Sequence, residues 1–419
     1  MLYNMHDART QALVPMRLMA EATRLAFLNP FQPLSYTPFG RMMASASTVM
    51  EGLLTEREKP EWGLARTHID GEAVPIAIET AVETPFCNLL HFKRLGAAMK
   101  RRTDPAILLV APMSGHHATL LRGTVEALLP DHEVYVTDWI DARLVPKAEG
   151  RFGVARYIDT VIDFMRFMAD RDGGAGETPY HAMAVCQPAP LVMAAAAILA
   201  EQDAPHAPNG MILMGGPIDP AANPTIVTQA AENRSIDWFE HHGIHRVPAR
   251  YPGANRRVYP GFLQLRAFMA MNPGRHTDAH WRMFRHLVRG DGESADKTAT
   301  FYDEYMAVMD TAADFYLETV DQIFKRRLLP KGEFLHHGRR VNPAAIVKTA
   351  LMTIEGELDD ISAPGQTEAA HRLCASIPKE RRRHLVQPGV GHYGIFNGRK
   401  WREEIKPQIA EFVRETLAQ

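Results

Sequence analysis

Continuous apolar runs alternate with stretches of helical spacing along much of this chain. The runs are typical of strands buried on both faces, and several are followed by a helical pattern. The expected strands cover 106–111, 134–139, 181–185 and 211–214, with helices over 151–170 and 189–201. The same alternation is found again near the C-terminus, with strands expected at 349–354 and 384–387 and helices at 365–376 and 400–417. It predicts an α/β fold with a mostly parallel, doubly wound sheet that helices cover on both faces.

Two parts of the chain lack this alternation of strand and helix patterns. Residues 1–95 contain two helical patterns, and we expect a helical accessory segment there. Residues 217–345 are rich in aromatic residues, His, Arg, Gly and Pro, and we expect an inserted, mainly helical cap. The predicted division is an accessory segment at 1–95, the first part of the core at 96–216, the cap at 217–345 and the second part of the core at 346–419.

The two N-terminal helices are expected over residues 8–28 and 39–57 and are rich in Met and Leu. Two interpretations fit this composition. In the first, the helices pack on the main body of the protein. In the second, they attach the protein to a hydrophobic surface. The sequence leaves both open.

Opposite charges nearly balance in the chain, with 47 Lys and Arg against 49 Asp and Glu. No basic excess is available to neutralise phosphates, which argues against a nucleic-acid partner. The longest strongly apolar run, residues 191–200, is too short to span a bilayer, and no secretory signal is readable at the N-terminus. We therefore expect a soluble, cytoplasmic protein without a transmembrane segment.

The chain has three cysteines and no CxxC pair, which argues against a disulfide framework and a thiolate zinc site. Cys186 stands in Ala-Val-Cys-Gln-Pro, between an expected strand and an expected helix. Such a turn exposes a residue at the carboxyl edge of the sheet, and the positive end of the helix favours a thiolate. Cys186 is thus the candidate nucleophile, with a buried core cysteine as the alternative. For Cys87 and Cys374 we expect packing roles.

An acid and a histidine follow Cys186 in the order used by α/β-hydrolases. Asp359 and Asp360 come after a late strand, where a carboxylate can orient a histidine and balance its charge. His392 lies in the glycine-flanked loop after the last expected strand. Cys186, Asp359 and His392 therefore form a candidate catalytic triad, with Asp360 open as the other acid.

A third loop, Pro-Met-Ser-Gly-His-His at residues 112–117, follows an early strand. Hydrolases of this type place one oxyanion-hole amide there and another on the residue after the nucleophile. The backbone N–H groups of Ser114, or Met113, and Gln187 are the candidates. The adjacent His116 and His117 raise a metal site as an alternative, but no carboxylate or cysteine lies nearby at ligand spacing.

Five segments carry a family resemblance. They are residues 184–188, 112–117, the strand 134–139, the helix 301–305 with Leu-Pro-Lys-Gly at 329–332, and Gly-His-Tyr-Gly at 391–394. Together they resemble the intracellular polyhydroxyalkanoate (poly-3-hydroxybutyrate) depolymerases, cysteine-type α/β-hydrolases related to the polyhydroxyalkanoate synthases. Ordinary esterases carry Gly-x-Ser-x-Gly and synthases usually Gly-x-Cys-x-Gly. Ala184 and Pro188 replace both glycines here, as in the depolymerases. The resemblance covers nearly the whole chain.

The resemblance implies an α/β-hydrolase fold and a triad of Cys186, Asp359 and His392. In the related synthases the acid is followed by one residue and then Ile, so Asp359-Asp360-Ile361 favours Asp359. The implied activity is cleavage of polyester ester bonds through an acyl thioester. No metal or organic cofactor is implied, although coenzyme A can replace water as the acyl acceptor.

The implied partners are the polymer and the surface of its cytoplasmic granules, and the oligomeric state, a homo-oligomer included, stays open. Side-chain length preference is open as well. Two alternatives remain. A synthase-like acyltransferase or a thioesterase acting on 3-hydroxyacyl groups would use the same triad, and a granule-bound structural protein would keep only the fold.

Overall fold

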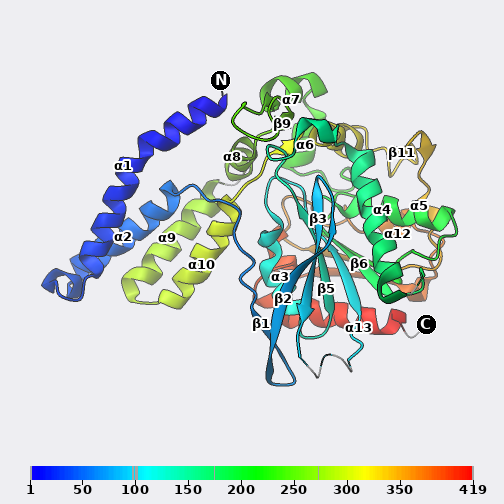
Figure 1. Cartoon of the computed structure of the whole chain (residues 1–419), viewed down its shortest axis with the longest axis horizontal. Coiled ribbons are helices and arrows are strands. Elements are labelled where there is room, and N and C mark those ends of the chain that lie inside the picture. Colours follow the sequence, from blue (N-terminus) through cyan, green and yellow to red (C-terminus); the bar gives the residue numbers. More distant parts are fainter. Residues whose placement is uncertain (1, 97–98, 100–101, 174, 272, 418–419) are drawn as a thin grey trace. The chain divides into compact units, whose positions relative to one another are not determined.

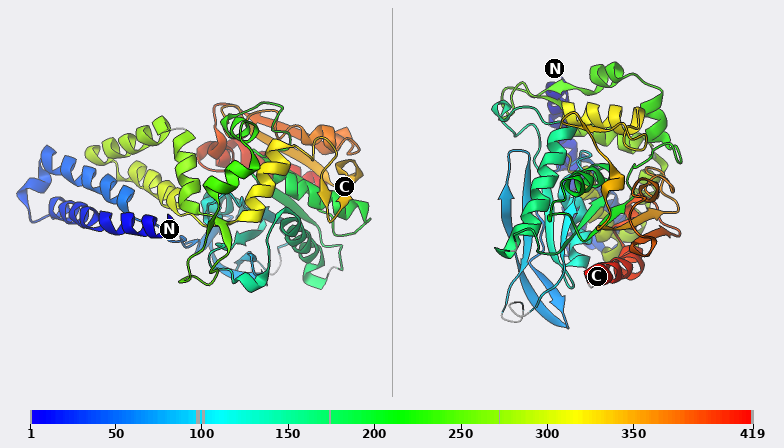
Figure 2. Two further views of the ribbon diagram at one scale, coloured as in Figure 1. Left: turned by 90° about the horizontal axis from the view of Figure 1, so that it is seen from above. Right: turned by 90° about the vertical axis from the view of Figure 1, so that its right-hand side faces the viewer.

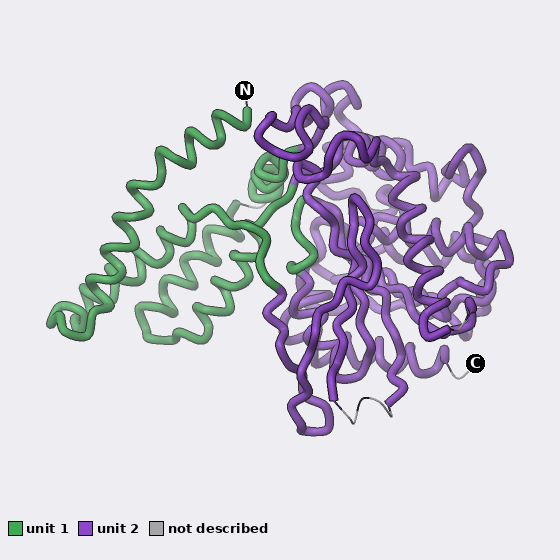
Figure 3. The backbone as a smooth tube through the Cα atoms, in the orientation of Figure 1, with its two compact units in different colours: residues 1–61, 115–120, 260–309 green, residues 62–114, 121–259, 310–419 purple. Residues whose placement is uncertain are grey.

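The computed structural model describes residues 2–96, 99, 102–173, 175–271 and 273–417, and the chain forms two compact units. Unit 1 contains the chain up to Glu61 together with residues 115–120 and 260–309 (Figure 3). Unit 2 contains residues 62–114, 121–259 and 310–419. All five candidate catalytic and oxyanion-hole residues belong to unit 2, which can therefore be analysed by itself.

A sheet of nine strands, counted over the described residues, forms the centre of unit 2 in the order β1-β2-β3-β5-β4-β6-β7-β13-β14 (Figure 1). The strands are β1 Arg66–Ile69, β2 Glu72–Glu83, β3 Cys87–Arg94, β4 Ala106–Val110, β5 Glu133–Trp139, β6 Tyr180–Val185, β7 Gly210–Met214, β13 Ala350–Gly356 and β14 Arg382–Gln387. The strands from β5 to β14 in this order pair in parallel, while β1, β2 and β3 pair antiparallel. Parallel strands bring their carboxyl ends to one edge, where sites form in open α/β sheets.

Helices cover both faces of this sheet (Figures 1 and 2). They are α3 Arg122–Leu128, α4 Val154–Asp170, α5 Ala189–Glu201, α12 Ala370–Leu373 and α13 Lys406–Leu417. The apolar stripe of α4 packs on the sheet, where Tyr157 stacks on Trp139 of β5 with ring centroids 4.3 Å apart. On α13, Thr416 hydrogen-bonds the ring of His181 in β6 at 2.7 Å. The core thus lies between the sheet and these helices: α4 and α13 each turn one apolar face to the sheet, while α5 is buried along nearly its whole length.

Further elements of unit 2 stand between β7 and β13 in the sequence. They are α6 Ile226–Glu232, α7 Ile236–Gly243, β8 His245–Arg246, β9 Arg257–Tyr259, β10 Thr311–Ala312, α11 Ala313–Glu318, the π-helix Thr319–Lys325, β11 Leu335–His336 and β12 Arg339–Arg340. β10, β9 and β8 form a small sheet, and β11 and β12 form a hairpin.

Unit 1 is helical. Its helices are α1 Leu2–Leu28, α2 Pro38–Leu54, α8 Gly261–Met271, α9 Pro273–Arg289 and α10 Gly292–Met306. α1 and α2 form a helical hairpin, in which Arg24 pairs with Glu51 at 2.6 Å. Thr37 caps α2 by accepting a hydrogen bond from the Gly40 N–H at 3.0 Å. No helix built from the described residues is long and apolar enough to cross a membrane.

The predicted α/β-hydrolase fold is confirmed, but several predicted segments differ from the structure in their type or their boundaries. Residues 66–94 supply three antiparallel strands where a helical segment is expected. The expected cap is shared between the units, because 260–309 clusters with the N-terminal helices and the rest with the sheet. The helix expected over 365–376 shrinks to the short α12. The sequence does not predict β2, because its buried and exposed positions are mixed and Pro75 interrupts it. It therefore shows no continuous apolar run.

Candidate active site

Cys186 occupies a sharp turn between β6 and α5. Its φ angle is +67°, in the left-handed region that a residue with a side chain rarely adopts. Two hydrogen bonds hold the turn: the Cys186 N–H donates to the Met214 carbonyl at 2.7 Å, and the Ala189 N–H donates to the Cys186 carbonyl at 3.2 Å. A backbone held in this region by its surroundings is typical of a nucleophile elbow.

The neighbouring strand leaves room for this turn. A Cβ atom at Gly216 would collide with the Ala189 Cβ and lie 2.9 Å from the Cys186 carbonyl oxygen. Ala184 and Pro188 occupy the positions that are glycines in ordinary esterases, and both are buried. The space that the elbow needs is therefore provided by a glycine after β7.

His392 and Asp359 face each other at the carboxyl ends of β14 and β13. The His392 Nδ1 lies 2.7 Å from Asp359 Oδ2, and both side chains are buried. The other carboxylate oxygen, Oδ1, accepts hydrogen bonds from the N–H groups of Ile361 and Ser362, each at 2.9 Å. Donors on both oxygens stabilise the ionised carboxylate. Asp360 is exposed, so the structure pairs His392 with Asp359.

A side-chain hydrogen bond also links His392 to Cys186, which completes the row Cys186–His392–Asp359. Burial by itself disfavours the charged imidazolium and lowers the pKa of His392. The attraction of Asp359 and Cys186, with the hydrogen bonds to both, outweighs burial and raises the pKa of His392 well above its usual value. The raised pKa makes this imidazole a stronger base than an ordinary histidine side chain. Of the three cysteines, Cys186 is half-buried, whereas Cys87 and Cys374 are buried.

Gly215, which sequence reasoning missed, shapes this row. Its φ angle is +54°, and a Cβ atom there would lie 2.6 Å from Ile395 Cδ1, 3.2 Å from His392 Cε1 and 3.4 Å from Asp359 Oδ2. The available signal was a Gly-Gly pair directly after a buried strand.

Gly215→Ala is therefore expected to displace the His392 ring and to lower kcat by about 10- to 100-fold, because misplacement of a catalytic group by about 1 Å can cost that much. The steady-state rate of ester cleavage measures the effect. Gly332→Ala is the matched control, since Gly332 also has a positive φ but a Cβ there would meet nothing within 4 Å. Equal activity of the Gly215 variant and the control would contradict this role.

The loop after β4 is braced by three hydrogen bonds. The Ala111 N–H donates to Thr137 Oγ1 and the Trp139 Nε1–H donates to the Ala111 carbonyl, each at 2.9 Å. The Met113 N–H donates to the side-chain Oε1 of Gln187 at 3.2 Å. The Met113 amide thus already has an acceptor in Gln187, and Ser114 stays the other oxyanion-hole candidate in this loop. The role of the Gln187 side chain as a brace carried no sequence signal.

The histidine pair after Ser114 belongs to unit 1. His116 is buried, and its ring lies against Tyr305 and Phe268 with centroids 5.0 and 5.6 Å away. Burial lowers the pKa of His116 to about 4, although a backbone hydrogen bond with Tyr305 opposes the shift. His116 is thus a neutral packing residue near pH 7.

Comparison with known proteins finds a family match over part of the chain. Residues 215–417 match the family model described as PHB de-polymerase C-terminus, a range that includes Asp359 and His392 and begins after Cys186. No curated protein matches the chain.

Among solved structures, an esterase from Thermogutta terrifontis is 16% identical with a TM-score of 0.40, covering 84% of this chain and 97% of that one. A soluble variant of monoglyceride lipase from Saccharomyces cerevisiae is 10% identical with a TM-score of 0.48, covering 83% and 97%. The 2-hydroxy-6-oxo-6-phenylhexa-2,4-dienoate hydrolase of Rhodococcus sp. strain RHA1 is 13% identical with a TM-score of 0.43, covering 81% and 99%. The fold itself rests on the sheet order and the turn at Cys186. The chain thus has an α/β-hydrolase fold, and its residues 215–417 are similar to the PHB depolymerase family.

Proposed function

We propose that this protein is an intracellular depolymerase that cleaves the ester bonds of poly(3-hydroxybutyrate) or a related polyhydroxyalkanoate through a thioester on Cys186. The observation that carries the proposal is the hydrogen-bonded row Cys186–His392–Asp359 at the carboxyl ends of three parallel strands. The family match over residues 215–417 supports the substrate class. The near-neutral chain also suits a neutral polyester better than a charged partner.

In the first half of the reaction, His392 accepts the proton of Cys186, and Asp359 stabilises the resulting imidazolium. The thiolate attacks the ester carbonyl of a 3-hydroxyacyl unit and forms a tetrahedral oxyanion. The backbone N–H groups of Ser114 and Gln187 are the proposed donors to this oxyanion. The carbon–oxygen ester bond then breaks, and His392 returns the proton to the departing hydroxyl of the shortened chain.

In the second half, His392 removes a proton from the acyl acceptor, which attacks the Cys186 thioester. Collapse of the second tetrahedral intermediate releases the 3-hydroxyacyl group and the thiolate, which regains its proton. Water gives a free acid, and coenzyme A gives a new thioester, since thioesters react readily with either acceptor. We propose water as the acceptor, without a metal or organic cofactor.

Gln187 offers a second contact to the acyl group. Its Oε1 accepts the Met113 N–H, and its Nε2 carries two hydrogens that can be donated. This Nε2 is buried and has no hydrogen-bond partner among the described residues. Because a buried donor without a partner is costly, we propose that a substrate oxygen supplies the missing acceptor.

The proposed reaction is tested by its products. Purified protein is expected to release free 3-hydroxybutyrate or its oligomers from amorphous polymer granules without added coenzyme A, as measured by chromatography of the soluble fraction. Release that requires coenzyme A and yields 3-hydroxybutyryl-coenzyme A would instead assign thiolysis. Polymer growth from 3-hydroxybutyryl-coenzyme A would assign a synthase-like acyltransferase, and hydrolysis of that thioester alone would assign a thioesterase.

We place the contact with the granule on the α1–α2 hairpin of unit 1. Large apolar side chains are exposed along it, with exposed fractions of 71% for Met19 and 92% for Phe31. Others on the hairpin are Met5, Val14, Met16, Leu18, Leu25, Leu28, Leu34, Tyr36, Phe39, Met42, Met50 and Leu53. So many exposed large apolar side chains on one hairpin are typical of an interaction surface. On α1 three arginines stand against Asp7 and Glu21, so the helix lacks the large basic excess that an anionic membrane attracts, which favours a neutral polyester surface.

Replacing both Met19 and Phe31 with Glu is expected to weaken cosedimentation with granules by at least about 10-fold, because two apolar side chains no longer leave water on binding. Hydrolysis of a soluble 3-hydroxybutyrate trimer is expected to remain unchanged. Gln11→Glu adds a charge at an exposed polar position of the same helix and serves as the matched control. Unaltered granule binding by the double variant would refute this placement.

A further inference from the structure

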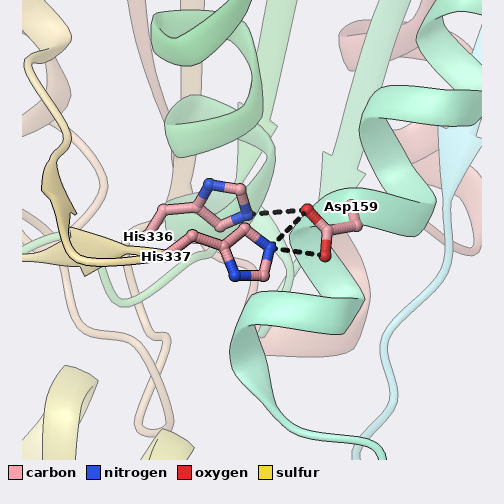
Figure 4. A group of neighbouring side chains, drawn as sticks. All are labelled: Asp159, His336 and His337. Atoms are coloured by element: carbon pink, nitrogen blue, oxygen red, sulfur yellow. Dashed lines mark hydrogen bonds and ion pairs between the residues drawn. The ribbon is translucent and has the colours of Figure 1, made fainter.

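Three side chains of unit 2 outside the Cys186 row converge on one point. Asp159 lies on α4, and the adjacent His336 and His337 lie at the end of β11 (Figure 4). His336 Nε2 is 2.8 Å from Asp159 Oδ1, while His337 Nε2 is 3.1 Å from Oδ1 and 2.9 Å from Oδ2. Each histidine thus presents the same ring nitrogen to a single carboxylate.

The separation of these atoms suits a shared metal ion. The ligand atoms of the three residues all lie within 4.8 Å of one another. Zinc binds imidazole nitrogen and carboxylate oxygen at about 2.0–2.2 Å, so ligand atoms around a tetrahedral ion lie about 3–3.5 Å apart. Small side-chain rotations would therefore open enough space for an ion between the three donors.

Two well-defined elements hold the donors in place. Asp159 lies in a helix of 17 residues whose neighbouring Tyr157 and Ile158 are buried. The histidines lie on the hairpin β11–β12, where His337 and Gly338 form the two-residue turn with φ angles of +46° and +76°. Such turns favour Asn, Asp or Gly at their first central position. The imidazole at this position is held in a sparsely populated backbone conformation that aims it at α4.

The arginines near Asp159 on α4 bind other groups. Arg156, one turn earlier on α4, donates to the carbonyls of Glu149 and Arg151, and Arg166 pairs with Asp163. The side chains of His337 and Asp159 are 62% and 39% exposed, whereas that of His336 is 11% exposed. An ion could therefore enter from solvent and keep a water molecule as its fourth ligand.

We propose that Asp159, His336 and His337 form a surface site for a divalent transition-metal ion, of which Zn²⁺ is the representative. The ion replaces the hydrogen bonds between the histidines and the carboxylate, and the protons shared in those bonds go to solvent. By joining the β11–β12 hairpin to α4, the ion stabilises unit 2. The site is independent of the proposed ester cleavage, because it shares no residue with the Cys186 row.

The test is titration of the full chain with Zn²⁺ in chelator-free buffer near neutral pH, followed by calorimetry. We expect the wild type to bind with Kd below about 10 µM and to show a higher thermal unfolding midpoint with Zn²⁺. His336→Gln, His337→Gln and Asp159→Asn are each expected to weaken binding at least about 10-fold and to remove the thermal shift. Unfolding midpoints without metal show whether each variant is folded.

The chain provides a matched control in a second histidine pair. His241 and His242 are also adjacent and exposed, but their Nδ1 atoms bond to the carbonyls of Asp237 and Trp238 and not to a carboxylate. His241→Gln is expected to bind Zn²⁺ like the wild type. Wild-type affinity in the His337 variant, or an equal loss in the His241 variant, would overturn the proposal by making the binding adventitious.

Discussion

Replacing Cys186 with alanine is expected to reduce ester cleavage by a factor on the order of 10⁵, the scale seen when the nucleophile of a triad is removed. The thiol forms the covalent bond to the acyl group, so its loss leaves only polymer binding and the oxyanion-hole amides. Release of soluble 3-hydroxybutyrate from amorphous granules measures the rate. The variant should still cosediment with granules, because the contact proposed on α1–α2 does not involve Cys186.

Cys374→Ala is the matched control for this prediction. Cys374 is buried, with its sulfur 3.6 Å from the sulfur of Met193, and burial raises its pKa to about 12. It is therefore an inert packing thiol, and its variant should keep most of the activity. Iodoacetamide should inactivate the wild type and the Cys374 variant alike, with the added mass on Cys186. Cleavage by the Cys186 variant at the wild-type rate would refute the covalent mechanism.

The sequence predicts the buried parallel strands well and the antiparallel ones poorly, for a physical reason. β4 and β6 are covered on both faces, so each reads as a continuous apolar run. β2 needs only one apolar face, and its mixed pattern resembles a loop. The sequence predicts a helix over residues 8–28 from loosely helical apolar positions, whereas α1 begins at Leu2 and only Tyr3 and Ala20 are buried on it. Burial of those apolar positions therefore could not be inferred from their spacing.

The candidate site divides in the same way. Cys186, Asp359 and His392 could be located because each follows an expected strand, and parallel strands end at one edge. The contacts that place them carry no such signal. The contact of Gly215 with His392 and the bond from Met113 to Gln187 depend on the spacing of neighbouring strands. The cluster of Asp159 with His336 and His337 joins residues that are far apart in the sequence, so no local motif predicts it.

Asp359→Asn is expected to lower kcat by about 10⁴-fold, while Asp360→Asn should stay within about twofold of the wild type. Asp359 Oδ2 accepts the hydrogen from His392 Nδ1, and an asparagine can place an N–H there and favour the wrong tautomer of the imidazole. Asp360 is exposed and adjacent, so its variant tests the loss of one negative charge at nearly the same place.

The same two variants are expected to differ in their effect on the pKa of His392. Attraction to Asp359 helps to raise the pKa of His392 against the opposing effect of burial. Without that charge the effect of burial dominates, and the pKa of His392 falls. The pKa of His392, followed by NMR of its ring protons, should therefore fall in Asp359→Asn and stay close to the wild-type value in Asp360→Asn. An unchanged pKa of His392 in Asp359→Asn would mean that the Asp359 carboxylate does not control the charge of His392, and the triad would then lose its acid.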